Sequence, residues 1–85
     1  MEKHKAKLLG QVLGSQLRQE RNRAGLTQDD IAVAIGVDRR HYARIESGQK
    51  RISIIRLIEV CEALNIAPSD VISNTKRILD HENRN

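Results

Sequence analysis

The stretch that decides the fold is TQDDIAVAIGVDRRHYARIESG, which occupies residues 27–48. Thr27, with an acid three residues later, has the pattern of a capping box at a helix start, and Gly36 is a typical helix end. After a turn of about three residues, Asp38 is a good N-cap for a second short helix, Arg39–Ser47. Two short helices so closely joined predict a helix-turn-helix, although an ordinary helical hairpin has similar spacing.

Apolar residues at spacings of three and four predict three more helices, so we expect an all-α fold of five helices. The chain has 85 residues, which suits a single domain. The first helix ends near Gly25, the fourth begins after Ser53, and the fifth begins at Pro68. The core covers about residues 8–72, and residues 73–85 form a helical extension or a polar tail.

Each predicted helix has an apolar face that should reach the core. These side chains are Leu9, Val12, Leu13 and Leu17 from the first helix, Ile31, Ala34 and Ile35 from the second, Tyr42 and Ile45 from the third, Ile54, Leu57, Ile58, Cys61 and Leu64 from the fourth, and Val71 and Ile72 from the fifth. Because Cys61 lies on an apolar face, we interpret it as a small buried hydrophobe and not as a reactive thiol.

The positive charge is concentrated in one short segment. The formal net charge is +4, and residues 39–51, with five Lys or Arg and one Glu, also sum to +4. A localised basic patch is typical of a protein that binds a polyanion, although a run of charge is more often only a solvated helix face. Tyr42 is the only aromatic residue. Because proteins that bind single strands usually stack bases on several rings, the composition favours duplex DNA.

The predicted third helix has two distinct faces. At about 100° per residue, one arc holds the residues Arg39, Arg40, Ala43, Arg44 and Ser47. Tyr42 and Ile45 lie on the opposite side, where the core is expected. Arginine donates two hydrogen bonds to guanine, and a small alanine allows close approach to a thymine methyl group. The residues expected to read bases are Arg39, Arg40, Ala43 and Arg44.

Contacts to DNA phosphates are expected from the borders of this face. Polar and cationic side chains follow the helix in a loop, and the amide of Gln28 lies at the N-terminus of the second helix. The candidate phosphate-binding residues are Gln28, His41, Ser47, Gln49, Lys50 and Arg51.

From Leu13 to Ile72 the chain resembles the Cro/repressor-type (XRE-like) helix-turn-helix family of bacterial and phage regulators. The residues that carry the resemblance are Leu17, Arg21, Gly25, Leu26, Thr27, Gln28, Ile31, Ala32, Gly36, Val37, Ile45, Glu46 and Gly48. It implies a compact five-helix fold of the lambda-repressor type and a DNA-binding transcriptional regulator in the cytoplasm. The segment DRRHYARIESGQKRIS is similar to controller proteins of restriction–modification systems.

The resemblance also implies roles for single residues. Ala32 should let the two helices of the motif cross closely, and Gln28 should contact DNA. Arg21 of the first helix should form a structural ion pair with Glu46, which explains a lone glutamate among so many cations. Removing one member of such a partly buried pair would leave the other without a partner.

Because specific operators are usually read by twofold dimers on adjacent half-sites, we expect a homodimer formed through the last two helices. The candidate interface residues are Ile55, Ile66, Val71, Ile72, Ile78 and Leu79, although some of them must complete the core of the single chain. Such a regulator would occlude a promoter or recruit RNA polymerase, under the control of its own concentration.

The alternative hypothesis is an antitoxin-like subunit that neutralises a toxin-like protein partner and also binds DNA. An enzyme is disfavoured because the three histidines and the one cysteine have neither metal-ligand nor catalytic spacing. We therefore expect no catalytic residue, metal, cofactor or small-molecule ligand. No apolar run is long enough to span a membrane, and a single cysteine suits a reducing cytoplasm.

Overall fold

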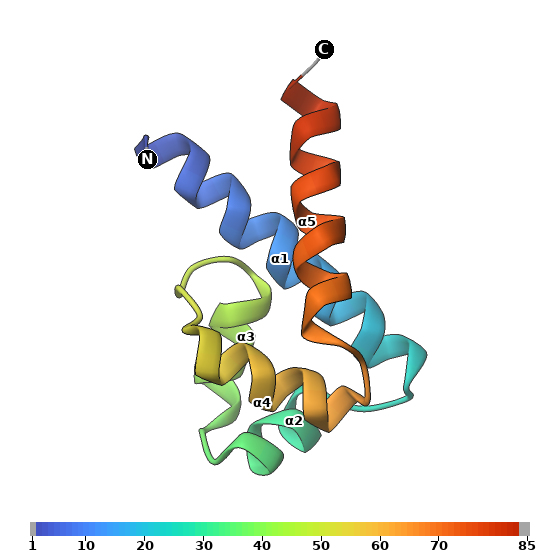
Figure 1. Ribbon diagram of the computed structural model, residues 1–85. Helices are drawn as coiled ribbons and strands as arrows, with labels where there is room; N and C mark the ends of the chain where they lie inside the picture. The colour runs from blue at the N-terminus through green and yellow to red at the C-terminus, as the bar shows by residue number, and fades with distance from the viewer. Residues whose placement is uncertain (1, 84–85) are drawn as a thin grey trace.

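The predicted helix-turn-helix is formed by α2 (Gln28–Ile35) and α3 (Arg39–Glu46), which the turn at residues 36–38 joins (Figure 1). The computed structural model describes residues 2–83. The first residue and the last part of the predicted tail, residues 84–85, lie outside the described chain.

Local hydrogen bonds fix the ends of both helices in the predicted way. The Thr27 hydroxyl accepts the backbone N–H of Asp30 at 3.0 Å, and the Asp30 carboxylate accepts that of Thr27 at 2.8 Å, which completes a capping box. Gly36 ends α2 with a φ of 76°, a conformation that a residue without Cβ adopts without strain. Asp38 caps α3 by accepting the N–H of His41 at 2.8 Å. The turn is therefore set by chemistry within a few residues.

Three further helices surround this pair. α1 (Lys3–Arg23) and α5 (Pro68–Asn83) are the two long helices, and α4 (Ile54–Leu64) precedes α5. α1 packs against α3 and α5, while α2 packs against α3 and α4. Figure 1 shows the N-terminal part of α1 and the C-terminal part of α5 diverging at the end of the molecule away from α2. Among the described residues, no helix is long and apolar enough to cross a bilayer.

The core lies where the five helices meet. Its buried apolar residues are Leu17, Ile31, Ala32, Ile35, Tyr42, Ile45, Leu57, Val60, Cys61, Leu64, Val71 and Leu79. Cys61 is completely buried, and burial raises the pKa of its thiol. The predicted burial of Cys61 is confirmed, and because the thiolate is the nucleophile, burial and the raised pKa both disfavour its reaction.

The inward face of α4 differs from the predicted one. Ile54 and Ile58 are 61% and 42% exposed, whereas Val60, which the predicted face left out, is fully buried. The buried residues of this helix are Leu57, Val60, Cys61 and Leu64. Isoleucines cover an adjacent side of the same helix, so spacing alone did not identify which apolar side meets the core.

Two smaller predictions about the core were wrong. In α2, Ala34 is exposed and Ala32 is buried, which is the alanine that the family resemblance singled out. In α5, Ile72 is 46% exposed, while Val71 is buried. α5 contacts the core through a stripe at four-residue spacing, in which Thr75 follows Val71 and donates its hydroxyl to the Val71 carbonyl at 2.8 Å.

Candidate nucleic-acid interface

α3 has one cationic face and one face anchored in the core. Its exposed cations are Arg39, Arg40 and Arg44, and no acidic side chain in the described chain pairs with them. Ala43 lies among them and is half-buried, as is His41 at the edge of the face. On the opposite side, Tyr42 and Ile45 are 0% and 3% exposed. The helix therefore presents uncompensated positive charge on a fixed support.

The loop after α3 folds back on the end of that helix. The backbone N–H groups of Gln49 and Lys50 donate to the Arg44 carbonyl at 2.9 Å and 3.2 Å, and the Ser47 hydroxyl donates to it at 3.2 Å. These two backbone N–H groups are therefore engaged within the chain. The side chains of Gln49, Lys50 and Arg51 are exposed.

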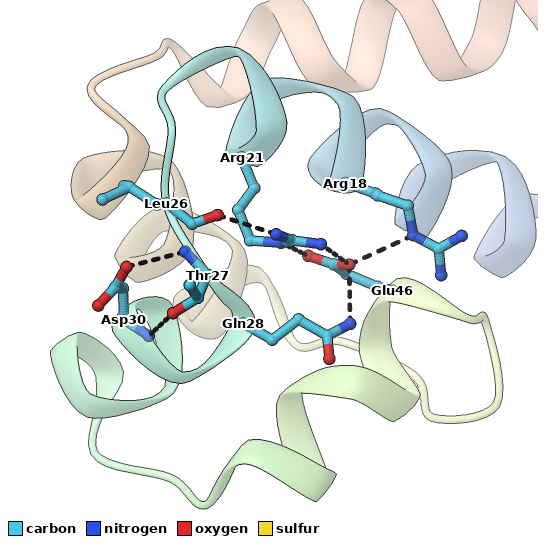
Figure 2. A network of polar contacts seen from close by, with 7 residues as sticks. All are labelled: Arg18, Arg21, Leu26, Thr27, Gln28, Asp30 and Glu46. Carbon is cyan, nitrogen blue, oxygen red and sulfur yellow. Dashed lines mark hydrogen bonds and ion pairs between the residues drawn. The ribbon is translucent and has the colours of Figure 1, made fainter.

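The predicted ion pair between Arg21 and Glu46 is present, and it joins α1 to the end of α3 (Figure 2). Arg21 Nε donates to Glu46 Oε2 at 2.7 Å, and Arg21 Nη2 donates to Glu46 Oε1 at 3.1 Å. The remaining nitrogen, Nη1, donates to the Leu26 carbonyl at 2.9 Å. One guanidinium thus binds a carboxylate with two parallel bonds and also holds the segment before α2.

Glu46 is ionised although its side chain is fully buried. Burial by itself raises the pKa of the Glu46 carboxyl, but hydrogen bonds from Arg21 and Gln28 outweigh burial and lower that pKa. The hydrogen bond to Glu46 likewise raises the pKa of Arg21. The lone acid of the basic segment is therefore a structural anion, as the resemblance implied.

Two further donors reach the same carboxylate, and neither contact was predicted from the sequence. Gln28 Nε2 donates to Glu46 Oε1 at 3.1 Å, and Arg18 Nε approaches the same oxygen at 3.4 Å. Gln28 is half-buried and lies at the start of α2, and Arg18 lies on α1 (Figure 2). Arg18 precedes Arg21 by three residues, so both arginines lie on the same side of α1. This spacing is the sequence signal that could have identified Arg18.

α1 and the end of α3 approach each other backbone to backbone. A Cβ added at Gly14 would overlap the carbonyl oxygen of Glu46 and lie 2.6 Å from that of Ile45. Gly48, with a φ of 79°, also lies close to α1, because its added Cβ would be 2.8 Å from Gln11 Cα. Glycine at both positions allows α1 to hold the end of α3 without an intervening layer of side chains.

α4 supports the turn of the motif through one arginine. Arg56 Nη1 donates to the carbonyl of Ile35, the last residue of α2, at 2.8 Å, and to Glu59 Oε1 at 3.1 Å. The end of α2 would otherwise leave such carbonyls without partners. No local sequence pattern predicts this contact, because Arg56 and Ile35 lie on different helices.

A family model described as helix-turn-helix matches residues 17–71, which include the motif, the Glu46 network and α4. The chain belongs to the helix-turn-helix family. The predicted resemblance to Cro/repressor-type regulators is thereby confirmed, and so is the all-α five-helix fold.

Two curated relatives of this helix-turn-helix chain are regulators by name. Control protein C.MunI from Mycoplasma sp is 29% identical over 65 residues, which cover 75% of this chain and 88% of that protein. The uncharacterized HTH-type transcriptional regulator y4dJ from Sinorhizobium fredii is 25% identical over 64 residues, which cover 75% of this chain and 83% of that protein. The family assignment supports DNA-binding transcriptional regulation as the general function.

Two solved structures share the fold of this family member. The clp gene regulator ClgR from Corynebacterium glutamicum superimposes with a TM-score of 0.82 at 29% identity, covering 89% of this chain and 81% of that one. The restriction-modification controller protein C.AhdI from Aeromonas hydrophila gives a TM-score of 0.69 at 31% identity, covering 72% of this chain and 92% of that one. The similarity to controller proteins that the sequence predicted is therefore confirmed.

The candidate interface residues fall into two groups. Val71 and Leu79 are 3% and 1% exposed, so they belong to the core of this helix-turn-helix domain and are not available to a second chain. Ile55 and Ile72 are 70% and 46% exposed, and the remaining candidates Ile66 and Ile78 are half-buried. The α4 isoleucines that the predicted core wrongly included, Ile54 and Ile58, are exposed as well.

Proposed function

We propose that this chain is a sequence-specific regulator that reads operator half-sites as a homodimer, with α3 in the major groove. The observation that carries the proposal is the exposed, unpaired cationic face of α3, formed by Arg39, Arg40 and Arg44. Its opposite face is fixed in the core by Tyr42 and Ile45. A rigid helix that exposes arginines is suited to hydrogen-bonding base edges, since arginine matches the two acceptors of guanine.

We assign contacts with bases to the exposed face of α3 and contacts with the DNA backbone to the residues around that face. Arg39 and Arg40, in the first turn of α3, meet base edges, and Arg44 reaches the next bases one turn later. Ala43 allows close approach between them. Around this face, the side chains expected to contact the backbone are Gln28, His41, Ser47, Gln49, Lys50 and Arg51. Because the Gln49 and Lys50 amides are engaged with Arg44, these loop residues would bind phosphate through their side chains.

Selection of bound sites from a random pool of duplexes tests this proposal directly. We expect a palindromic consensus whose half-sites contain guanine and lie about one helical turn apart. Recovery of the pool without enrichment of any sequence would contradict sequence-specific reading. Enrichment of a single, non-palindromic half-site would contradict the homodimer while retaining base reading by α3.

We propose that the exposed isoleucines of α4, together with Ile72 of α5, form the dimer interface. Ile55→Lys should convert the dimer into a monomer in sedimentation equilibrium and weaken operator binding, because a charged group cannot be buried unpaired at the interface. Val33→Lys is the matched control, since Val33 is 74% exposed on α2. It should leave the dimer intact, and a dimer that survives Ile55→Lys would overturn this interface.

The similarity to controller proteins supports a regulatory role in a restriction–modification system, through promoter occlusion or recruitment of RNA polymerase. The same isoleucines also offer a surface to a toxin-like protein, so the antitoxin alternative predicts a different binding partner for them. Purification from the native cell distinguishes the two. A homodimer without a second protein supports the regulator, and a stoichiometric partner lost on Ile55→Lys supports the antitoxin.

A further inference from the structure

One carboxylate oxygen collects three nitrogen donors at the border between α1, α2 and α3. Glu46 Oε1 accepts Arg21 Nη2 and Gln28 Nε2, both at 3.1 Å, and Arg18 Nε approaches it at 3.4 Å (Figure 2). Arg18 and Gln28, which are 10 positions apart in sequence, therefore have their side chains side by side. The carboxylate is the element that brings them together.

Arg18 adds little to the stability of the buried carboxylate. Arg21 and Gln28 already give Glu46 three shorter hydrogen bonds, including the 2.7 Å bond to Oε2. The 3.4 Å contact of Arg18 lies near the limit of hydrogen-bond distance, and its side chain is 52% exposed. Stabilisation of the buried Glu46 carboxylate therefore does not explain why Arg18 lies beside it.

The cluster has donors left over and a net positive charge. A guanidinium carries five N–H donors, and within the described chain Arg18 uses only Nε, so both terminal nitrogens are free. Figure 2 shows these nitrogens directed away from Glu46. Gln28 Nε2 has a second hydrogen besides the one given to Glu46. Two arginines and one carboxylate leave one positive charge, and Arg18 is the member that solvent reaches.

The cluster borders the proposed reading face. On a helix with about 100° per residue, Glu46 lies about 20° from Arg39 and about 40° from Tyr42, at the border between the reading face and the core face. An anion bound there would sit beside α3 on the side of α2, whereas Lys50 and Arg51 lie beyond its C-terminal end. We propose that Arg18 and Gln28, held together by Glu46, bind a single DNA backbone phosphate, and that α1 thereby contributes a contact from outside the helix-turn-helix motif.

Salt dependence of duplex binding tests this assignment, which rests on the proposed function. The slope of log K against log salt is negative, and each phosphate contact that is lost reduces its magnitude by about 0.9. Arg18→Ala should weaken binding several-fold at low salt, equally for the selected operator and an unrelated duplex, and the difference should shrink about threefold between about 50 and 200 mM salt. Arg18→Lys should keep the wild-type slope, because it keeps the charge. Arg23→Ala, which removes a 77% exposed cation paired with Glu20, should change neither quantity.

A purely structural role for Arg18 gives a different result. In that case Arg18→Ala lowers the melting temperature and leaves the salt slope unchanged, which overturns the proposal. Double substitution with Gln28→Ala adds a second readout, since loss of one shared phosphate predicts less than additive effects of the two substitutions; full additivity contradicts a shared phosphate. If the wild type binds no duplex, the proposed function itself fails. If it binds and Arg18→Ala keeps its slope, only the Arg18 assignment fails.

Discussion

Arg21 and Glu46 join α1 to the end of α3 through a buried ion pair, with Arg21 Nε 2.7 Å from Glu46 Oε2. The Glu46 side chain is 0% exposed and that of Arg21 is 12% exposed. The pair therefore fixes the proposed reading helix from the side opposite to solvent. Glu46 is the only acidic residue in the basic segment, residues 39–51, and its ion pair with Arg21 holds in place the helix that carries the exposed arginines.

Arg21→Ala should lower the free energy of unfolding by roughly 3–5 kcal/mol, because it leaves a buried carboxylate without its main partner. Chemical denaturation measures this loss. Arg23→Ala, at an exposed pair on the same helix, should change it by less than about 0.5 kcal/mol. If Arg21→Ala fails to fold, Arg21→Met combined with Glu46→Met should recover a folded chain, since apolar replacement of both partners is often tolerated. An unchanged melting temperature in Arg21→Ala contradicts this account of Glu46.

Stability should fall in acid as Glu46 is protonated. The pKa of Glu46 is lower in the folded chain than its ordinary value of 4.5, so its contribution is complete above that pH and is lost as the pH drops through the folded pKa. Glu46→Gln should flatten the dependence of unfolding free energy on pH below about 4.5. Hydrogen bonds from Thr27 also lower the pKa of Asp30. Asp30→Asn should therefore remove a separate part of the loss of stability in acid. Identical acid dependence in wild type and Glu46→Gln would refute the prediction.

Two glycines of α1 should respond oppositely to alanine. Gly14→Ala should destabilise the fold by about 1–3 kcal/mol, because the new methyl group overlaps the backbone of α3. Gly10→Ala places its methyl 3.4 Å from the Gly48 carbonyl oxygen, which is close to ordinary contact. It should be neutral or stabilise the helix by up to about 1 kcal/mol. Thermal unfolding of both variants measures the contrast, and similar melting temperatures would disprove the close crossing.

The parts of the fold that depend on neighbouring residues were predictable from the sequence. Thr27, Asp38 and Ser53 cap their helices through backbone groups three residues away, so their chemistry is visible in a few letters. Glu46 and its partner Arg21 are 25 positions apart, and only the family resemblance indicated that pair.

The parts that depend on tertiary packing were less predictable. α4 carries apolar residues on more than one side, and the choice between burying Val60 and burying Ile58 depends on α2 and α5. The convergence of Arg18 and Gln28 on one oxygen is likewise a property of three helices. Local patterns therefore located the candidate reading face, whereas the contacts of Arg18 and Gln28 with Glu46 came only from the structure.

Reading of bases by α3 is the central claim, and one comparison tests it most directly. Arg39→Ala and Lys50→Ala are titrated by fluorescence anisotropy with the selected operator and with an operator changed at one guanine. Arg39→Ala should cost about 1–3 kcal/mol on the operator and abolish discrimination at one base pair. Lys50→Ala should weaken both duplexes equally and reduce the salt dependence. If Arg39, Arg40 and Arg44 can all be replaced by alanine with no change in operator affinity, α3 does not read the major groove.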